Sequence, residues 1–180
     1  MIVSGASDLY QYVLPRLGTK STDPHYSGVL YGVLGTNIRM INKFYTANGL
    51  PISEDKTWVH GDGYGMAQER DVMYTNVIPL GTDVLALHLD REPRFYASVS
   101  FNGCVWPLLK NAETTDYKND VEKQVNYYYG INTDGFSGTG VYLRSGIGIM
   151  KYVHPDDTNR KEIKAKAEPA IRFAEILLIY

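Results

Sequence analysis

The chain has 180 residues, which is enough for one domain or for part of a larger one. Hydrophobic residues make up 44% of it and charged residues 21%, a composition typical of a globular protein that argues against a disordered tail. The net charge is −2 with both signs interspersed, which argues against a nucleic-acid-binding surface, because such a surface needs clustered Lys and Arg.

Tyrosine and cysteine are the residue types whose counts are informative. The chain has 15 Tyr beside 2 Trp and 5 Phe. Because tyrosine combines a flat apolar face with a polar tip, it suits half-wet surfaces such as the faces of sugars, although edges and loops of many folds use it as well. The one cysteine, Cys104, excludes an intrachain disulfide framework, and a buried thiol is its simplest interpretation.

The first half of the chain predicts one helix among irregular segments. Residues 1–30 contain several Gly, Ser and Pro and are predicted to be irregular. A helix is predicted over residues 36–48, where four apolar side chains share one face: Ile38, Ile41, Phe44 and Tyr45. Asn48-Gly49 supplies a stop signal, and Pro51 prevents continuation. Residues 55–82 are rich in Gly and Asp and predict long loops with short elements.

The second half begins with a predicted strand. Residues 94–101 alternate between two sets of side chains with the period of a strand, and Asn102-Gly103 follows as a turn signal. Residues 110–126 are polar and predict a loop that carries a short helix. The Gly-rich stretch 130–148 contains a strand-like segment at residues 141–143.

The last segment predicts a helix that begins near Pro169 and has apolar residues at helical spacing. It carries no Gly or Asn stop signal and no polar tail before Tyr180. A helix this apolar needs partners on more than one side, so we expect the chain to be truncated there. Neither a signal peptide nor an apolar stretch of about 20 residues is present in the sequence.

Four segments, in chain order, resemble the SusD/RagB family. The second, Arg91-Glu92-Pro93-Arg94-Phe95-Tyr96, is similar to the family's R-[DE]-P-R-F-Y signature and is the most specific. The first resembles a helix followed by N-G-L-P, the third a T-G-Y-Y…R-K-Y segment and the fourth an I-R-L-A-E-V-L-L helix; they lie at residues 38–51, 139–152 and 171–178. The insertion at residues 145–148 departs from the family pattern.

The resemblance implies a fold that is mainly α with loop-rich irregular regions and short strands. It implies part of a SusD-like tetratricopeptide-type helical fold, truncated at both ends. Residues 1–180 would then form a partial SusD/RagB-like domain. The lipid-bearing cysteine, the N-terminal helical repeats and the C-terminal helices of the family would be missing from it.

The same resemblance implies a non-enzymatic protein that captures nutrients. Family members are lipid-anchored, surface-exposed proteins of the cell outer membrane that serve polysaccharide utilisation. They bind a glycan or another nutrient and deliver it to a SusC-like TonB-dependent transporter. Two alternatives stay open: a RagB-like peptide-binding or transporter-gating protein, and a secreted glycoside hydrolase.

Three aromatic residues are the candidates for ligand binding: Trp58, Tyr64 and Trp106. Each lies in a Gly-rich or Pro-flanked segment rather than in an amphipathic periodic one, where an aromatic ring can meet solvent and stack on a sugar. Packing onto the scaffold is the competing interpretation. It applies especially to Trp106, which accompanies the signature segment.

The charged residues of the resembling segments are interpreted as structural. Arg91, Glu92 and Arg94, with Pro93 between them, can tie loop carbonyls and a carboxylate together. Arg172 and Glu175, at positions i and i+3, are expected to fix a helix contact.

No catalytic constellation is evident, and we predict no catalytic residues and no required cofactor. The four histidines lack zinc spacing. Two loops with hard oxygen ligands, at residues 132–135 and 154–157, could hold calcium, but a solvated turn is the simpler interpretation.

Overall fold

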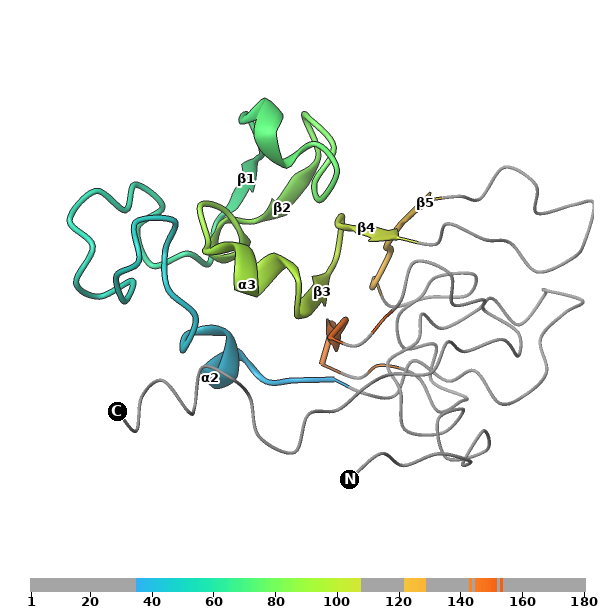
Figure 1. Cartoon of the computed structure of the whole chain (residues 1–180), viewed down its shortest axis with the longest axis horizontal. Helices are drawn as coiled ribbons and strands as arrows, with labels where there is room; N and C mark the ends of the chain where they lie inside the picture. The colour runs from blue at the N-terminus through green and yellow to red at the C-terminus, as the bar shows by residue number, and fades with distance from the viewer. Residues whose placement is uncertain (1–34, 108–121, 129–142, 144, 152, 154–180) are drawn as a thin grey trace, which may run out of the picture.

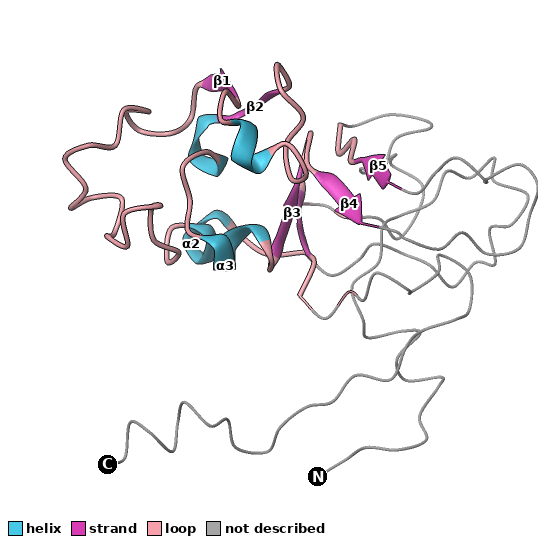
Figure 2. Ribbon diagram, turned by 45° about the horizontal axis from the view of Figure 1, so that its top comes forward, coloured by secondary structure: helices cyan, strands magenta, loops and turns pink. Residues whose placement is uncertain are grey.

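The computed structural model of the chain describes residues 35–107, 122–128, 143, 145–151 and 153, which are coloured in Figure 1. Short elements follow one another along these residues: α2 (Ile38–Ile41), β1 (Met66–Gln68), η1 (Val72–Tyr74), β2 (Asp83–Leu85), η2 (Ala86–His88), α3 (Pro93–Tyr96), β3 (Val99–Phe101), β4 (Val105–Pro107), β5 (Glu122–Gln124) and β6 (Ile147–Ile149). Each is three or four residues long, and loops connect them (Figure 2).

The described strands form antiparallel pairs. β1 pairs with β2, β3 with β6 and β4 with β5, each in a two-stranded sheet. The prediction of a mainly α fold is therefore wrong for the described residues, whose two α-helices, α2 and α3, span one turn each. Loops and close strand pairs take up the backbone hydrogen bonds that long helices would have satisfied internally.

Helix α2 is much shorter than the predicted helix over residues 36–48. Asn37 caps its start, where the side-chain oxygen accepts a hydrogen bond from the amide of Met40 at 3.1 Å. The carbonyl oxygens of Ile41, the last residue of α2, and of Phe44 just beyond it accept hydrogen bonds from Nη2 of Arg91 at 2.8 and 2.7 Å. The chain leaves the helical path because a distant guanidinium takes carbonyls that a longer helix would have used itself. Local periodicity cannot predict this competition.

The predicted strand over residues 94–101 is half wrong. Its first half is helix α3, which starts at Pro93 in the first turn, where the missing N–H costs nothing. Its second half is β3, whose three residues are all buried. Alternating apolar residues in a short run fit a helical turn as well as a strand, because the segment is too short for the two periods to differ.

The predicted turn at Asn102-Gly103 is confirmed. The amide of Cys104 donates to the carbonyl oxygen of Phe101 at 3.1 Å, so the chain reverses between β3 and β4. Gly103 has φ +89°, and a Cβ atom there would lie 2.9 Å from Cγ1 of Val84. Only glycine fits this position without strain.

The core lies where α3 and β3 meet the other strands. Phe95 and Phe101 are both fully buried and stack with ring centroids 5.8 Å apart. Phe44, next to α2, packs edge-on against Phe95 at 5.5 Å and so attaches the N-terminal segment to this core. Figure 1 shows β3 at the centre of the described part, between α3 and the β4–β5 pair.

Several predictions fall outside the described residues. They are the irregular segment 1–30, the strand at 141–142, the terminal helix with Arg172 and Glu175, and both calcium-compatible loops. Of the polar loop predicted over residues 110–126, the structure describes residues 122–126, where β5 forms a strand pair with β4.

Candidate ligand pocket

Arg91 is the structural centre of the signature segment. Its side chain is 0% exposed and donates to four backbone carbonyl oxygens, those of Leu87 (2.8 Å), Ile41 (2.8 Å), Phe44 (2.7 Å) and Tyr45 (3.2 Å). The guanidinium carbon also lies 4.9 Å from the ring centroid of Phe95. Burial lowers the pKa of Arg91 to about 10, so the group stays charged at neutral pH. Arg91 thus joins α2 to the η2–α3 segment.

Glu92 and Arg94 form a second, more exposed part of the signature segment. Oε1 of Glu92 accepts from the amide of Tyr45 at 2.9 Å and from Nη2 of Arg94 at 2.7 Å. Burial acts to raise the pKa of Glu92, but the hydrogen bonds from Arg94 and Tyr45 outweigh it and lower the pKa overall. Pro93 stands between them as the first residue of α3.

A cavity of about 650 Å³ is lined in part by the buried residue His88. We name it the tyrosine pocket. Its described lining residues come from the start of α2, from β1, β2, η2 and β6, and from the segments next to β3 and β5: Thr36, Asn37, Ile38, Tyr64, Met66, Leu85, His88, Asn102, Tyr127, Tyr128, Ser145, Gly146 and Ile147. Its volume lies within the roughly 300–1,000 Å³ of small-molecule pockets.

Exposure separates the floor of this pocket from its rim. His88 and Ile147 are 4% and 8% exposed and form the floor, whereas Tyr64, Met66 and Tyr128 are 59–60% exposed and form the rim. Such a rim of two tyrosines and a methionine presents apolar faces with polar tips to a ligand.

His88 is a buried polar ring that makes no hydrogen bond among the described residues. Its imidazole packs against Phe101 at 4.3 Å and Phe95 at 6.0 Å between ring centroids. Neither ring nitrogen has a partner within the described part of the chain. Burial and the charge of Arg91 lower the pKa of His88 to about 3, so the ring is neutral at physiological pH. A neutral imidazole offers one N–H donor and one nitrogen acceptor.

Tyr127, which forms a wall of the pocket, is held by hydrogen bonds to Ser100 and Asn102. Oη of Tyr127 lies 2.8 Å from Oγ of Ser100, and the amide of Tyr127 donates to Oδ1 of Asn102 at 2.9 Å. A Cβ atom on Gly148 would clash with Oγ of Ser100 and lie 2.8 Å from Oη of Tyr127. The close approach of β6 to this wall therefore requires glycine at position 148.

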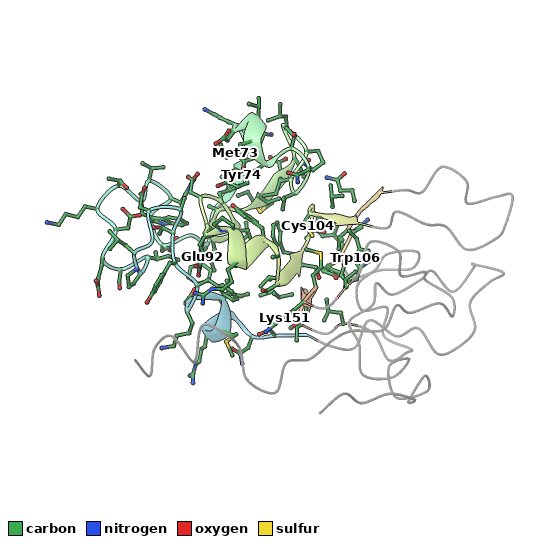
Figure 3. The ribbon with its side chains drawn as sticks, viewed as in Figure 1. Met73, Tyr74, Glu92, Cys104, Trp106 and Lys151 are labelled. Carbon is green, nitrogen blue, oxygen red and sulfur yellow. The ribbon has the colours of Figure 1, made fainter. Side chains whose placement is uncertain are left out.

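The structure does not bring the three predicted ligand-binding aromatics together. Tyr64 lies at the rim of the tyrosine pocket. Trp58 is half-buried elsewhere, with its ring 4.8 Å from His60 and 6.0 Å from the guanidinium of Arg91. Trp106 is the middle residue of β4 and is 2% exposed in the core, with Cys104 near it (Figure 3).

Sequence reasoning missed most of the pocket. His88 lies between Leu87 and Leu89 and belongs to a scattered set of histidines, so only its missing hydrogen bonds distinguish it. Tyr127 and Tyr128 lie in a run of three consecutive tyrosines at residues 127–129, next to the segment predicted as a polar loop. That run was a usable signal, because adjacent tyrosines outside a periodic element point to a half-wet surface.

Comparison with known proteins identifies the family. The sequence model of the SusD family matches residues 4–180. The chain belongs to the SusD family. The resemblance inferred from the four segments is therefore confirmed.

A solved structure agrees with this assignment at the level of the fold. The chain is similar to the selenomethionine form of BT4246, a SusD-like protein of Bacteroides, with a TM-score of 0.54 and 18% sequence identity. The similarity covers 94% of this chain and 27% of BT4246, so the chain spans about a quarter of that protein's length. No curated protein matches the chain.

Among the residues described, no helix has both the length and the apolar character needed to cross a bilayer. In the same ranges, no group of three or more His, Cys, Asp or Glu side chains is placed to hold a metal ion.

Proposed function

We propose that this protein captures an oligosaccharide nutrient at the surface of the bacterial outer membrane and binds it without chemical change. We further propose that it belongs to a lipid-anchored, surface-exposed protein that passes the ligand to a SusC-like TonB-dependent transporter. Membership of the SusD family supports both statements.

The tyrosine pocket is the observation that carries the oligosaccharide proposal. Its size suits a ligand of a few sugar rings, and its rim carries the exposed rings of Tyr64 and Tyr128. A sugar ring has an apolar C–H face and a hydroxylated edge. A tyrosine can stack on the face while polar groups deeper in the pocket bind the edge.

The polar side chains of the pocket favour hydroxyl groups as ligands. The side-chain oxygen of Asn37 accepts from Met40, and that of Asn102 accepts from Tyr127. Because each amide oxygen is held in this way, the NH2 group is the part of each side chain that can turn to a ligand. These side chains present donors without a formal charge.

Titration calorimetry on the full protein tests this proposal. The probes are cellohexaose, xylohexaose and mannohexaose, with a hexapeptide mixture for the peptide-binding alternative. We expect saturable binding of at least one oligosaccharide, and unchanged oligosaccharide when the mixture is analysed afterwards by chromatography. Binding of peptides alone would support the RagB-like alternative, and shortened products would support a glycoside hydrolase.

A matched pair of tyrosine variants tests the place of binding. Tyr64→Ala removes a rim ring and should weaken binding about tenfold, or about 1.4 kcal/mol, the size expected for one stacked aromatic. Tyr45→Ala removes a tyrosine that is 43% exposed and does not line the pocket, so it should leave affinity unchanged. Equal effects of the two variants in calorimetry would place the ligand elsewhere.

A further inference from the structure

Two asparagine side chains in the lining of the tyrosine pocket have a fixed orientation. The side-chain oxygen of Asn102 accepts from the amide of Tyr127 at 2.9 Å, and that of Asn37 accepts from the amide of Met40 at 3.1 Å. A backbone N–H can only donate, so the oxygen of each side chain must face it and the NH2 group must point away from it. Both donors are therefore oriented before a ligand arrives.

Both donors are also within reach of a ligand in this pocket. Asn37 is exposed and Asn102 is half-buried, and both line the cavity. Within the described part of the chain, neither NH2 group has an acceptor, and neither is among the fully buried polar atoms. A ligand oxygen can therefore replace the solvent at each of them.

The two asparagines follow segments that lie on opposite sides of β6. Phe101, the last residue of β3, is opposite Ile147 on one side of β6. On the other side, the amide of Thr36 donates to the carbonyl oxygen of Ile147 at 2.9 Å, and the residue before Thr36 forms an antiparallel bridge with β6. Ile147 thus has a neighbouring segment on each side.

The next residue of each segment is an asparagine, and the residue of the β6 chain at that level is Gly146. Asn37 and Asn102 therefore flank Gly146, which also lines the pocket. A Cβ atom on Gly146 would meet nothing within 4 Å, so the space beside this residue is open. Neighbouring strands lie about 5 Å apart, which places the backbones of the two asparagines about 10 Å from each other. That span exceeds the width of one sugar ring.

We propose that Asn37 and Asn102 are the specificity-determining residues of the pocket, and that their NH2 groups donate to oxygen atoms on two successive rings of an uncharged oligosaccharide that crosses Gly146. This inference rests on the proposed function, and it adds the binding atoms and the charge class of the ligand. None of the described lining residues is Lys, Arg, Asp or Glu, so a carboxylate or sulfate group on the ligand would find no countercharge among them.

Aspartate in place of each asparagine tests the donors and keeps the structural hydrogen bonds. In Asn102→Asp and Asn37→Asp, a carboxylate oxygen still accepts from the same backbone amide, and Asp caps a helix as well as Asn does. The NH2 group is what each variant loses. Asn126→Asp is the matched control, because Oδ1 of Asn126 also accepts from a backbone amide, that of Tyr128 at 3.3 Å, and residue 126 does not line the pocket.

The measurement is titration calorimetry on the full protein, with the neutral oligosaccharide that binds best among cellohexaose, xylohexaose and mannohexaose. We expect Asn102→Asp and Asn37→Asp each to weaken binding about tenfold, because a carboxylate has no hydrogen to donate and is costly to cover with an uncharged ligand. The double variant should lose about a hundredfold, since effects at sites this far apart add. Asn126→Asp should keep the affinity, and the melting temperatures of all variants should equal that of the unchanged protein.

A second titration of the unchanged protein tests the charge class of the ligand. Hexagalacturonic acid should bind at least tenfold more weakly than the neutral oligosaccharide. Tighter binding of the acid would overturn the inference.

The outcomes separate this inference from the proposed function. If the unchanged protein binds a neutral oligosaccharide and the variants at positions 37 and 102 bind it equally well, the inference is wrong and the proposed function stands. An equal loss of affinity in Asn126→Asp would show that added charge causes the effect, which would also overturn the inference. If no oligosaccharide binds the unchanged protein, the proposed function itself fails.

Discussion

His88 and Arg91 are three residues apart and differ in how their polar atoms are used. Both are buried and both lie close to the ring of Phe95, at 6.0 Å for the imidazole and 4.9 Å for the guanidinium carbon. Arg91 donates to four backbone carbonyls, whereas neither nitrogen of His88 has a partner among the described residues.

Two buried polar side chains in one segment therefore act on the fold in different ways. Arg91 is a buried charge with four hydrogen bonds to backbone carbonyls, and it holds loops together. His88, whose ring nitrogens have no partner among the described residues, contributes by packing against Phe95 and Phe101. The conspicuous signature residue is a structural one.

The largest effect is expected from Arg91→Met. The variant keeps the length of the side chain but leaves the carbonyl oxygens of Leu87 and Phe44 without the donor that Arg91 supplies, while that of Ile41 keeps the amide of Phe44. We expect the free energy of unfolding to fall by about 4 kcal/mol, since each unsatisfied buried group costs about 1–3 kcal/mol. Urea denaturation followed by tryptophan fluorescence measures this loss.

The control for this variant is Arg94→Met. The Arg94 side chain is 65% exposed and forms an ion pair with Glu92, so its loss should cost less than about 1 kcal/mol. Similar losses for the two variants would show that the carbonyl bonds of Arg91 do not hold the fold together.

A smaller loss is expected from Gly148→Ala, which tests the wall of the pocket. The added methyl group would clash with Ser100 and approach the hydroxyl of Tyr127 to 2.8 Å. We expect a cost of about 3 kcal/mol from overpacking, together with weaker oligosaccharide binding. Gly65→Ala is the matched control, because a Cβ atom there meets nothing within 4 Å and the measured unfolding free energy should hardly change.

A still smaller effect is the contribution of His88 to the pH dependence of the free energy of unfolding. Folding lowers the pKa of His88 from 6.5 to about 3, so the unfolded chain binds the proton more readily between these values. The stability linked to this group is fully present above pH 6.5 and is lost as the pH falls toward 3, by about 1.4 kcal/mol per unit. At pH 5 the loss is about 2 kcal/mol.

Urea denaturation at pH 5 and pH 7 checks this effect in the unchanged protein and in His88→Phe. The variant should lack about 2 kcal/mol of the pH dependence. Asp55 titrates outside this window, because hydrogen bonds from Thr46, Thr57 and Asn48 hold its pKa well below the usual range, so it contributes only at lower pH. Parallel pH profiles for the two proteins would mean that His88 is solvated in the folded state.

Part of the fold and little of the site could be predicted from the sequence. The loops over residues 55–82 and the turn at Asn102-Gly103 follow from glycine and aspartate, whose preferences are local. An aromatic residue in a Gly-rich loop tends to meet solvent, and Tyr64 is 59% exposed. Trp106 occupies a similar sequence context and is buried, which local context could not decide.

The family follows from the chain alone, because the order of four segments and the R-E-P-R-F-Y motif are properties of the sequence. That α2 ends after one turn depends on a distant residue, because a guanidinium that bonds its last carbonyl comes from Arg91, 50 residues further along. The placement of buried His88 and exposed Tyr64 in the lining of one pocket is likewise a result of tertiary packing. Burial and hydrogen bonding depend on which distant residues meet, and this information is not contained in local sequence.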